Sequence, residues 1–288
     1  LKRNGYVIAA YSSLLLVIIA QYSVFKDIFH FEEIYNGFFV IDSFGSFIKS
    51  LLLIGTGIIL YIYLINNKDS EINKIEFPIL ILLSVIGMML MVSSNDILSL
   101  FVAMELQSLS LYILVAFSRN DKNSSEAGVK YFVLGSLSTC IFLFGSSLIY
   151  GFFGTTNFTE ISNLISQIND MPLILIFGVV FILVSLSLKI SAAPFHMWTP
   201  DVYQGAPTII TAFLSVVPKI AAFAVIIRFL VVPFGEITVD WGKIILILSI
   251  TSMVVGSLGA LQQTELKRLL AYSTINHVGF MLIGLVSG

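Results

Sequence analysis

The stretch 173–208 reads LILIFGVVFILVSLSLKISAAPFHMWTPDVYQGAPT, and it decides the fold class. Its first part is an apolar run long enough for a membrane-spanning helix, whereas Pro194 and Pro200 interrupt the part that follows. Lys189 is the only formally charged side chain between Leu173 and Pro200. An ammonium group at that depth is costly in hydrocarbon unless it is paired or hydrated, so Lys189 is a candidate functional residue.

The composition of the whole chain agrees with a membrane environment. Of its 288 residues, 57% are hydrophobic and 11% are charged, and the mean hydropathy is +0.98. Soluble domains carry about 25% charged residues. We therefore expect an all-α polytopic membrane protein. The net charge of −2 does not suggest nucleic-acid binding, and the single cysteine, Cys140, excludes a disulfide framework or a thiol-ligated metal within the sequence.

Hydropathy divides the chain into nine apolar segments, each about long enough to cross a bilayer. They are 6–25, 38–65, 77–93, 97–118, 125–153, 172–191, 207–231, 241–262 and 266–287. The segment 194–206 is too short to span, and we expect a half-helix plus loop there, which is a broken helix at membrane depth. The expected organisation is a single transmembrane domain over 1–288.

The basic residues of the connecting segments favour one side of the membrane. If the chain crosses at every apolar segment, one side receives nine of them, against Lys26 and Lys243, with Arg228 nearby, on the other. The positive-inside rule then places the N-terminus on the inner side and the C-terminus on the outer side. The sequence lacks an initiator Met and stops directly after an apolar run, so we expect a truncated or split chain.

Three charges fall near the middle of predicted spans: Glu105, Lys189 and Lys219, the last directly after Pro218. A glutamate that faces a lysine can keep both groups charged, and separating them lets the lysine release a proton. Such groups, joined by water and by polar side chains, form a proton relay. His277 has suitable chemistry to extend it. A purely structural ion pair between helices is the alternative.

The interrupted segment contributes further candidates. His196 is either a member of the relay or a hydrogen-bonded histidine at the membrane interface. Asp201, after Pro200, either takes part in the site or simply caps or turns the chain. We expect Pro194 to mark the break itself.

The other polar residues near predicted spans have simpler interpretations. Lys49 is expected to extend toward the interface or to pair with Asp42, and Arg228 to extend toward the outer interface. Trp198 and Trp241 are expected as interfacial aromatic residues.

Four stretches of the sequence resemble segments of a known family. The run PFHMWTPDVYQGAP (194–207) is similar to a segment of the antiporter-like membrane subunits of respiratory complex I, and in particular to NADH dehydrogenase (ubiquinone) subunit 2, the bacterial subunit N. FVAMELQSLSL (101–111), EAGVKYFVLGSLSTCIFLFGSSLIYG (126–151) and LQQTELKRLLAYSTINHVGF (261–280) resemble the same family. Mitochondrial versions are the more similar.

The resemblance implies an antiporter-like bundle with two inverted five-helix repeats. It makes 77–231 a complete first repeat and 241–288 the start of the second. It also implies that Glu105, Lys189, Lys219 and His277 are the proton-relay residues, with Glu105 and Lys189 as the charge pair that switches. A separate chain could supply the missing C-terminal helices.

The implied function is a proton-translocating membrane-arm subunit of NADH:ubiquinone oxidoreductase, a translocase with no redox chemistry in this chain. NADH, FMN, iron–sulfur clusters and ubiquinone would bind to other subunits, so no cofactor is expected here. Expected neighbours are subunits 4, 4L, 6 and 3, together with lipids. The expected location is the mitochondrial inner membrane, or alternatively a bacterial inner membrane. An Mrp-type Na⁺/H⁺ antiporter subunit and a structural remnant that no longer pumps are the alternatives.

Overall fold

The computed structural model of the chain describes residues 2–65, 72–168 and 172–287. Within these ranges, nine helices are long and apolar enough to cross a membrane, which confirms the expected all-α polytopic fold. They are α1 (Lys2–Lys26), α2 (Ser43–Ile65), α3 (Glu76–Ser93), α4 (Ile97–Val115), α5 (Lys122–Phe153), α7 (Leu173–Ile190), α9 (Thr208–Val231), α10 (Thr238–Leu261) and α11 (Leu266–Ser287).

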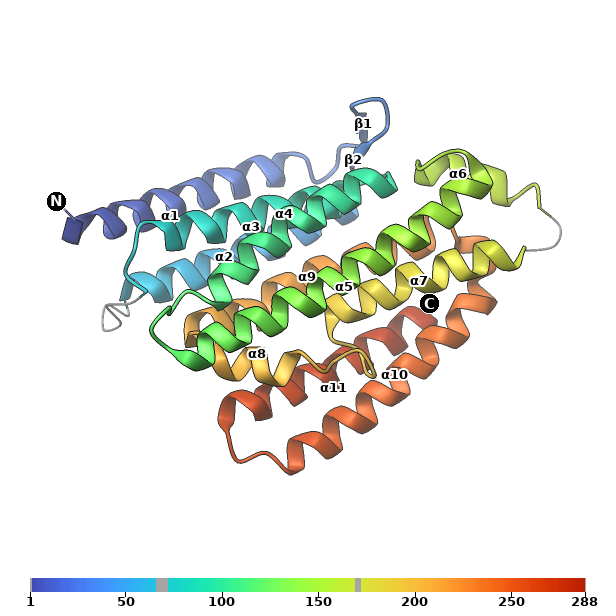
Figure 1. The fold of residues 1–288 in the computed structure, drawn as a ribbon. Coiled ribbons are helices and arrows are strands. Elements are labelled where there is room, and N and C mark those ends of the chain that lie inside the picture. The colour runs from blue at the N-terminus through green and yellow to red at the C-terminus, as the bar shows by residue number, and fades with distance from the viewer. Residues whose placement is uncertain (1, 66–71, 169–171, 288) are drawn as a thin grey trace.

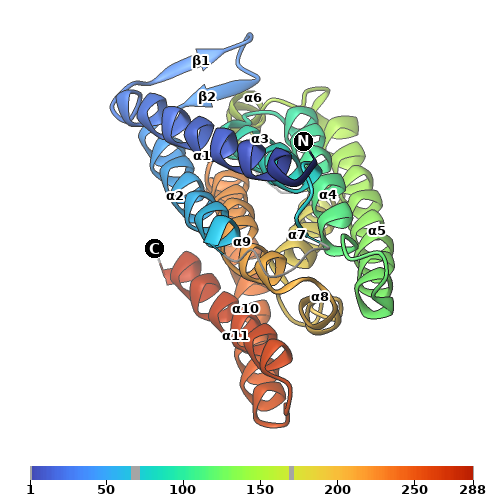
Figure 2. The same ribbon diagram turned by 90° about the vertical axis from the view of Figure 1, so that its left-hand side faces the viewer.

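The long helices lie roughly side by side, with the N-terminus at one end of the bundle and the C-terminus toward the other (Figure 1). Seen end-on, α9 lies between α2 and α7, whereas α10 and α11 lie together at one edge (Figure 2). Of the residues in the membrane-spanning part of α9, 72% are buried, which is the highest share among the nine described helices. Helix α9 is therefore the central helix of the bundle.

The short elements lie at the ends of these helices. They are β1 (Glu32–Ile34), β2 (Phe39–Ile41), α6 (Phe158–Ile165), α8 (Thr199–Gly205) and the 3-10 turn η1 (Gly235–Ile237). Helix α8 is the short helix predicted within 194–206, and it follows the interruption after α7.

The predicted span 38–65 begins later than expected, because its first residues form β2 of an antiparallel hairpin with β1. Tyr35, Asn36 and Gly37 all have positive φ angles in the connecting turn. The side-chain amides of Asn95 and Asn157 both donate to the Gly37 carbonyl at 3.1 Å, which holds the hairpin against the helix ends. An apolar strand and an apolar helix start cannot be separated by hydropathy alone.

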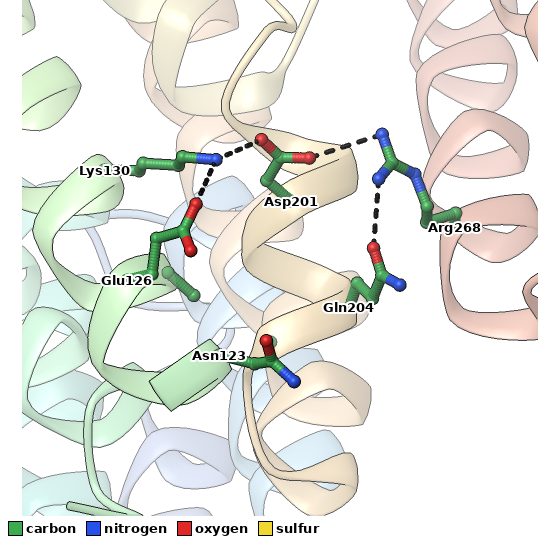
Figure 3. Close-up of a pocket in the computed structure, with 8 residues that line it drawn as sticks. Asn123, Glu126, Lys130, Asp201, Gln204 and Arg268 are labelled. Carbon is green, nitrogen blue, oxygen red and sulfur yellow. Dashed lines mark hydrogen bonds and ion pairs between the residues drawn. The ribbon is translucent and has the colours of Figure 1, made fainter. Parts of the chain in front are cut away.

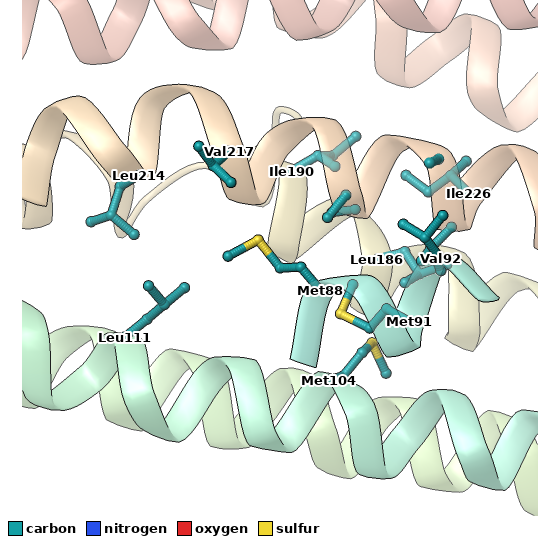
Figure 4. Packing of buried hydrophobic residues seen from close by; sticks show 14 of the residues in the cluster. Met88, Met91, Val92, Met104, Leu111, Leu186, Ile190, Leu214, Val217 and Ile226 are labelled. Atoms are coloured by element: carbon teal, nitrogen blue, oxygen red, sulfur yellow. The ribbon is translucent and has the colours of Figure 1, made fainter. Parts of the chain in front are cut away.

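The core lies where α3, α4, α7 and α9 meet. Figure 4 shows Met88, Met91 and Met104 packed among aliphatic side chains such as Leu186 and Ile226. Methionine is flexible and fills irregular gaps between helices.

Small residues bring neighbouring helices close together. A Cβ atom added to Gly87 of α3 would lie 2.6 Å from the backbone nitrogen of Gln107 in α4. A Cβ atom added to Gly256 of α10 would likewise lie 2.6 Å from the backbone nitrogen of Asn276 in α11. Close approach at small residues is the usual way for helices to pack in lipid.

Candidate functional site

The predicted helix break follows α7. The helix ends at Ile190, and Ser191 adopts a left-handed backbone conformation with φ of 65°. The backbone N–H of Ala192 donates to the Ser187 carbonyl at 2.9 Å, which closes the last turn. Helical structure resumes at Thr199, the first residue of α8. The last carbonyls of α7 therefore need partners from elsewhere.

Lys219 of α9 supplies such a partner. Its ammonium group donates to the Ile190 carbonyl at 2.7 Å and also to the Ser191 hydroxyl. The same ammonium lies 5.1 Å from the centre of the Trp198 ring. Lys219 is only 4% exposed. A lysine at the centre of the bundle is thus fixed directly at the end of the broken helix.

Lys189 lies one residue before that end and contacts α4. Its ammonium donates to the Ser108 hydroxyl at 2.7 Å, and Ser108 in turn donates to the Met104 carbonyl at 2.6 Å. Ser108 is 2% exposed. The contact joins α7 to the helix that carries Glu105.

Glu105 lies one turn before Ser108 on α4, and its carboxylate accepts from the Thr139 hydroxyl of α5 at 2.6 Å. We expected Glu105 to pair directly with Lys189. Between these two described residues the structure forms no direct ion pair: the Lys189 ammonium donates to Ser108, and the Glu105 carboxylate accepts from Thr139. Glu105 and Ser108 share one face of α4, so the carboxylate lies on the side of the helix that Lys189 contacts.

Trp198 differs from its predicted interfacial place, because it is buried inside the break. It is 5% exposed, and its indole N–H donates to the Leu188 carbonyl at 2.8 Å. Its ring stacks on Tyr131 of α5 with a centroid distance of 4.7 Å. Trp198 therefore fills the space between the Lys219 ammonium and α5. Trp241 is also buried, at 4% exposure, and donates to the Phe234 carbonyl at 2.9 Å.

Helix α10 holds the irregular segment between α7 and α8. The backbone N–H of Ala193 donates to the Ser252 hydroxyl at 2.8 Å. The carbonyl of the same residue accepts from the Thr251 hydroxyl at 2.9 Å. Both backbone groups of Ala193, directly before Pro194, are thus satisfied by one helix.

Asp201 of α8 is the centre of an ion-pair cluster at the surface. Its carboxylate binds Lys130 of α5 at 2.7 Å and Arg268 of α11 at 3.3 Å (Figure 3). Lys130 also pairs with Glu126 at 2.8 Å, and Arg268 donates to Gln204 at 3.0 Å. The cluster lines a polar cavity of about 220 Å³. Asp201 therefore joins three helices instead of capping its own.

The two candidate histidines lie apart from Lys189 and Lys219. The His277 side chain is exposed on α11, and the contacts that Lys219 makes with described residues do not include it. His196 is half-buried, with its ring 6.4 Å from that of Tyr272. Burial lowers the pKa of His196 from its usual value, against an opposing effect of the Pro194 backbone. The structure thus does not extend the lysine contacts to either histidine.

Arg228 also differs from its expected place. Its guanidinium binds both carboxylate oxygens of Asp42, at 2.8 and 3.0 Å, and its side chain is 6% exposed. Asp42 therefore binds Arg228 of α9, whereas pairing with Lys49 was one of the two arrangements expected for that lysine. Arg228 lies nine residues after Lys219, which places the two side chains on opposite faces of α9. The Asp42–Arg228 pair is thus separate from the contacts of Lys219.

Within the described ranges, the structure contains no group of three or more His, Cys, Asp or Glu residues that could hold a metal ion. The polar groups that make contacts near the break are amines, hydroxyls, one carboxylate and backbone carbonyls. The amines, the hydroxyls and the carboxylate can bind and pass protons, whereas the backbone carbonyls accept hydrogen bonds.

Residues 94–288 match the family described as NADH:quinone oxidoreductase/Mrp antiporter, TM. The chain belongs to this family. It is 47% identical over 256 residues to NADH-quinone oxidoreductase subunit N 1 of Rhizobium meliloti (strain 1021), in a match that covers 89% of this chain and 53% of that protein. It is 44% identical over 287 residues to subunit N 1 of Acidiphilium cryptum (strain JF-5), covering 100% and 59%. The chain thus spans about half the length of the curated relatives it matches.

Solved structures of the family have the same architecture. A chain of respiratory complex I from Thermus thermophilus with bound aureothin superposes with a TM-score of 0.82 at 32% identity, over 99% of this chain and 60% of that one. A chain of the Mrp complex from Dietzia sp. DQ12-45-1b gives a TM-score of 0.86 at 20% identity, over 98% and 54%. The second similarity shows the fold alone.

Sequence reasoning missed several residues that hold the buried charges in this family member. They are Ser108, Thr139, Ser191, Trp198 and Thr199, whose hydroxyl donates to Ser191 at 2.6 Å. Ser108 carried a usable signal, since it lies three residues after Glu105 and therefore on the same helix face. The others became apparent only through contacts between helices.

Proposed function

We propose that this chain is a proton-translocating membrane-arm subunit of an NADH:quinone oxidoreductase. The observation that carries the proposal is the pair of lysines at the helix break, of which Lys219 is buried and Lys189 is half-buried. Lys189 contacts α4 through Ser108, and Lys219 contacts the end of α7. Ion pairs buried for stability alone are weak stabilisers, whereas ionisable groups within a membrane usually serve transport. The relatives named subunit N support the same conclusion.

The proposed proton path uses the chain's own side chains. Lys189 and Lys219 each hold a proton, and Glu105 sets the charge near Lys189 through its position one turn from Ser108. A change in the position or protonation of Glu105 alters how firmly Lys189 keeps its proton. The two lysines meet at the end of α7. Lys189 is the residue directly before Ile190, and Lys219 donates a hydrogen bond to the Ile190 carbonyl.

The remaining parts of the proposal concern the whole enzyme. NADH, FMN, iron–sulfur clusters and ubiquinone are handled by other subunits, and subunits 4, 4L, 6 and 3 are the proposed neighbours. His277 is proposed to continue the proton path through groups that pack against its exposed face. The curated relatives cited above are bacterial, which favours a bacterial inner membrane over the mitochondrial inner membrane that the sequence suggested.

The complex I assignment is favoured over an Mrp-type antiporter by sequence. The identity to the Thermus thermophilus chain is 32%, against 20% for the Dietzia chain, although both share the fold. Copurification with flavin and iron–sulfur proteins distinguishes the two assemblies, since an antiporter has no need of them.

The proposal is tested in the assembled enzyme reconstituted into liposomes. Lys219→Ala and Glu105→Ala are each expected to lower NADH-driven proton pumping and coupled quinone reduction at least tenfold, which is typical of the loss of a proton-transfer group. Lys243→Ala is the matched control, because Lys243 is an exposed lysine on α10. It should pump normally.

Assembly is checked in every variant by the yield of the intact complex and by its flavin content. Full pumping by a correctly assembled Glu105→Ala or Lys219→Ala enzyme would contradict the relay. Loss of pumping in the Lys243→Ala control would show instead that the assay reports damage to the complex.

A further inference from the structure

A groove separate from Lys189 and Lys219 lies between α3 and α4, at the end of the bundle where α3 begins. It has a volume of about 460 Å³. Its lining combines charged residues at one end with apolar residues along the helices: Lys74, Glu76, Ile79, Leu80, Ile113, Ala116, Phe117 and Arg119. A groove with one charged end and apolar walls matches an amphiphilic ligand.

The charged end carries two basic side chains. Lys74 precedes α3 and Arg119 follows α4, and both are exposed. The Lys74 ammonium lies 5.3 Å from the centre of the Phe117 ring, which holds it over the groove. Neither side chain has an ion-pair partner among the described residues. Glu76 is the one acidic residue of the lining, and it lies in the first turn of α3, where a carboxylate complements the helix dipole.

The apolar walls continue along the membrane-spanning parts of both helices. Ile79 is 46% exposed and Ile113 is 53% exposed. One turn further along each helix, Leu83 is 38% and Leu109 is 52% exposed. These side chains form an apolar track that leads from the two basic residues into the depth of the membrane.

We propose that this groove is a binding site for an anionic phospholipid. Lys74 and Arg119 bind the phosphodiester of the headgroup, and an acyl chain lies along Ile79 and Ile113. The basic residues carry the identification, because basic pockets between transmembrane helices on the inner side of a membrane bind acidic headgroups. The site does not depend on the proposed proton path.

The apolar track distinguishes a lipid from a free phosphate ion. A phosphate would use only the two basic groups and would leave the exposed isoleucines in contact with solvent or hydrocarbon. A phospholipid uses both parts of the groove at once, and its acyl chain covers the apolar walls.

The test is native mass spectrometry of the purified full-length protein after removal of bound lipid. Tetraoleoyl cardiolipin and dioleoylphosphatidylcholine are titrated separately as the anionic and zwitterionic probes. We expect cardiolipin to bind more tightly. Lys74→Ala combined with Arg119→Ala should weaken cardiolipin binding about 25-fold, since each basic side chain contributes about fivefold. The same double change should alter phosphatidylcholine binding much less.

Four further variants sharpen the assignment. Lys26→Ala combined with Lys243→Ala removes the same charge from exposed lysines outside the groove and should leave cardiolipin binding within about twofold. Glu76→Gln should strengthen cardiolipin binding, because it removes the acidic group near the phosphodiester. Ile113→Trp should weaken binding of both lipids by filling the apolar track. Lys74→Gln combined with Arg119→Gln replaces the alanine pair if that pair fails to fold.

Equal affinity for the two lipids would overturn the proposal. So would unchanged cardiolipin binding in both the alanine and the glutamine versions of the Lys74 and Arg119 double variant. So would displacement of cardiolipin by millimolar inorganic phosphate, which would identify a simple anion site. If Ile113→Trp disrupts assembly with another protein and leaves lipid binding unchanged, the groove is a protein interface and the lipid assignment fails.

Discussion

The Lys219 ammonium lies 2.7 Å from the Ile190 carbonyl oxygen, so α9 supplies a hydrogen bond that α7 cannot make within itself at its end. A neutral amine still has hydrogens to donate, and the contact can therefore survive a change in protonation. The lysine that we propose as a proton carrier also holds the local backbone. The Nζ atom of Lys219 thus serves both as the proposed proton carrier and as the donor to the Ile190 carbonyl.

Ser108 is predicted to matter as much as the charges beside it. Ser108→Ala removes the hydroxyl that accepts from Lys189 and leaves a half-buried ammonium without that partner, at a cost of about 1–3 kcal/mol in folding stability. Proton pumping should fall as well, because Lys189 loses its contact with the Glu105 helix. Pumping in proteoliposomes and thermal unfolding in detergent measure the two effects. Ser108→Thr keeps a hydroxyl and should restore most of both; equal behaviour of the alanine and threonine variants would refute the role.

Gly87 tests the packing of α3 against α4. Gly87→Ala places a methyl group 2.6 Å from the Gln107 backbone nitrogen, so the helices must separate, and we expect a loss of about 1–3 kcal/mol in the free energy of unfolding. Gly151→Ala is the control, since its added Cβ would meet no atom within 4 Å beyond the neighbouring backbone of its own helix. That change in α5 should be neutral or stabilising by about 0.5–1 kcal/mol. Chemical denaturation measures both, and similar losses at the two sites would contradict the packing described.

Asp201 is predicted to order α8 more than it stabilises the whole protein. Asp201→Asn releases Lys130 and Arg268 together, but these groups are partly exposed, so we expect a loss of only about 1 kcal/mol. Hydrogen exchange of the α8 amides should become faster, and high salt should reduce the difference from the unchanged protein. Glu126→Gln removes only the pair with Lys130 and should leave α8 protected. Unchanged exchange in Asp201→Asn would show that the cluster does not hold α8.

His196 predicts a pH dependence of stability. Burial lowers its pKa in the folded protein, so the folded state disfavours the imidazolium form. The stability that depends on neutral His196 is fully present above its unfolded value of about 6.5, and it is lost as the pH falls through the lower folded pKa. The melting temperature should therefore fall less steeply on acidification in His196→Gln than in the unchanged protein. Parallel curves for the two proteins would exclude this contribution.

The nine spans could be predicted because lipid requires long apolar helices, and hydropathy measures that property directly. The hairpin at Glu32–Ile41 could not, because its strand Phe39–Ile41 is as apolar as the helix that follows it. The turn residues Asn36 and Gly37 were the only local signal, and hydropathy does not register them.

The candidate site was predictable in its charges but not in its contacts. Glu105, Lys189 and Lys219 stand out against apolar sequence, whereas the partners of each depend on which helices become neighbours. Asp42 and Arg228 are 186 residues apart, and their pairing requires that α2 pack against α9. Trp198 belongs to an aromatic type that is common at membrane interfaces, and only the fold places it beneath Lys219.

The contacts of α10 with Ala193 also bear on how the chain folds. Ser252 and Thr251 satisfy both backbone groups of a residue that precedes them by nearly sixty positions. A fragment that ended after α9 would leave those groups unpaired inside the bundle, in a medium that offers no water to replace them. The segment between α9 and α10 therefore does not separate two autonomous folding units. The broken helix reaches its final form only after the later helices have been inserted beside it.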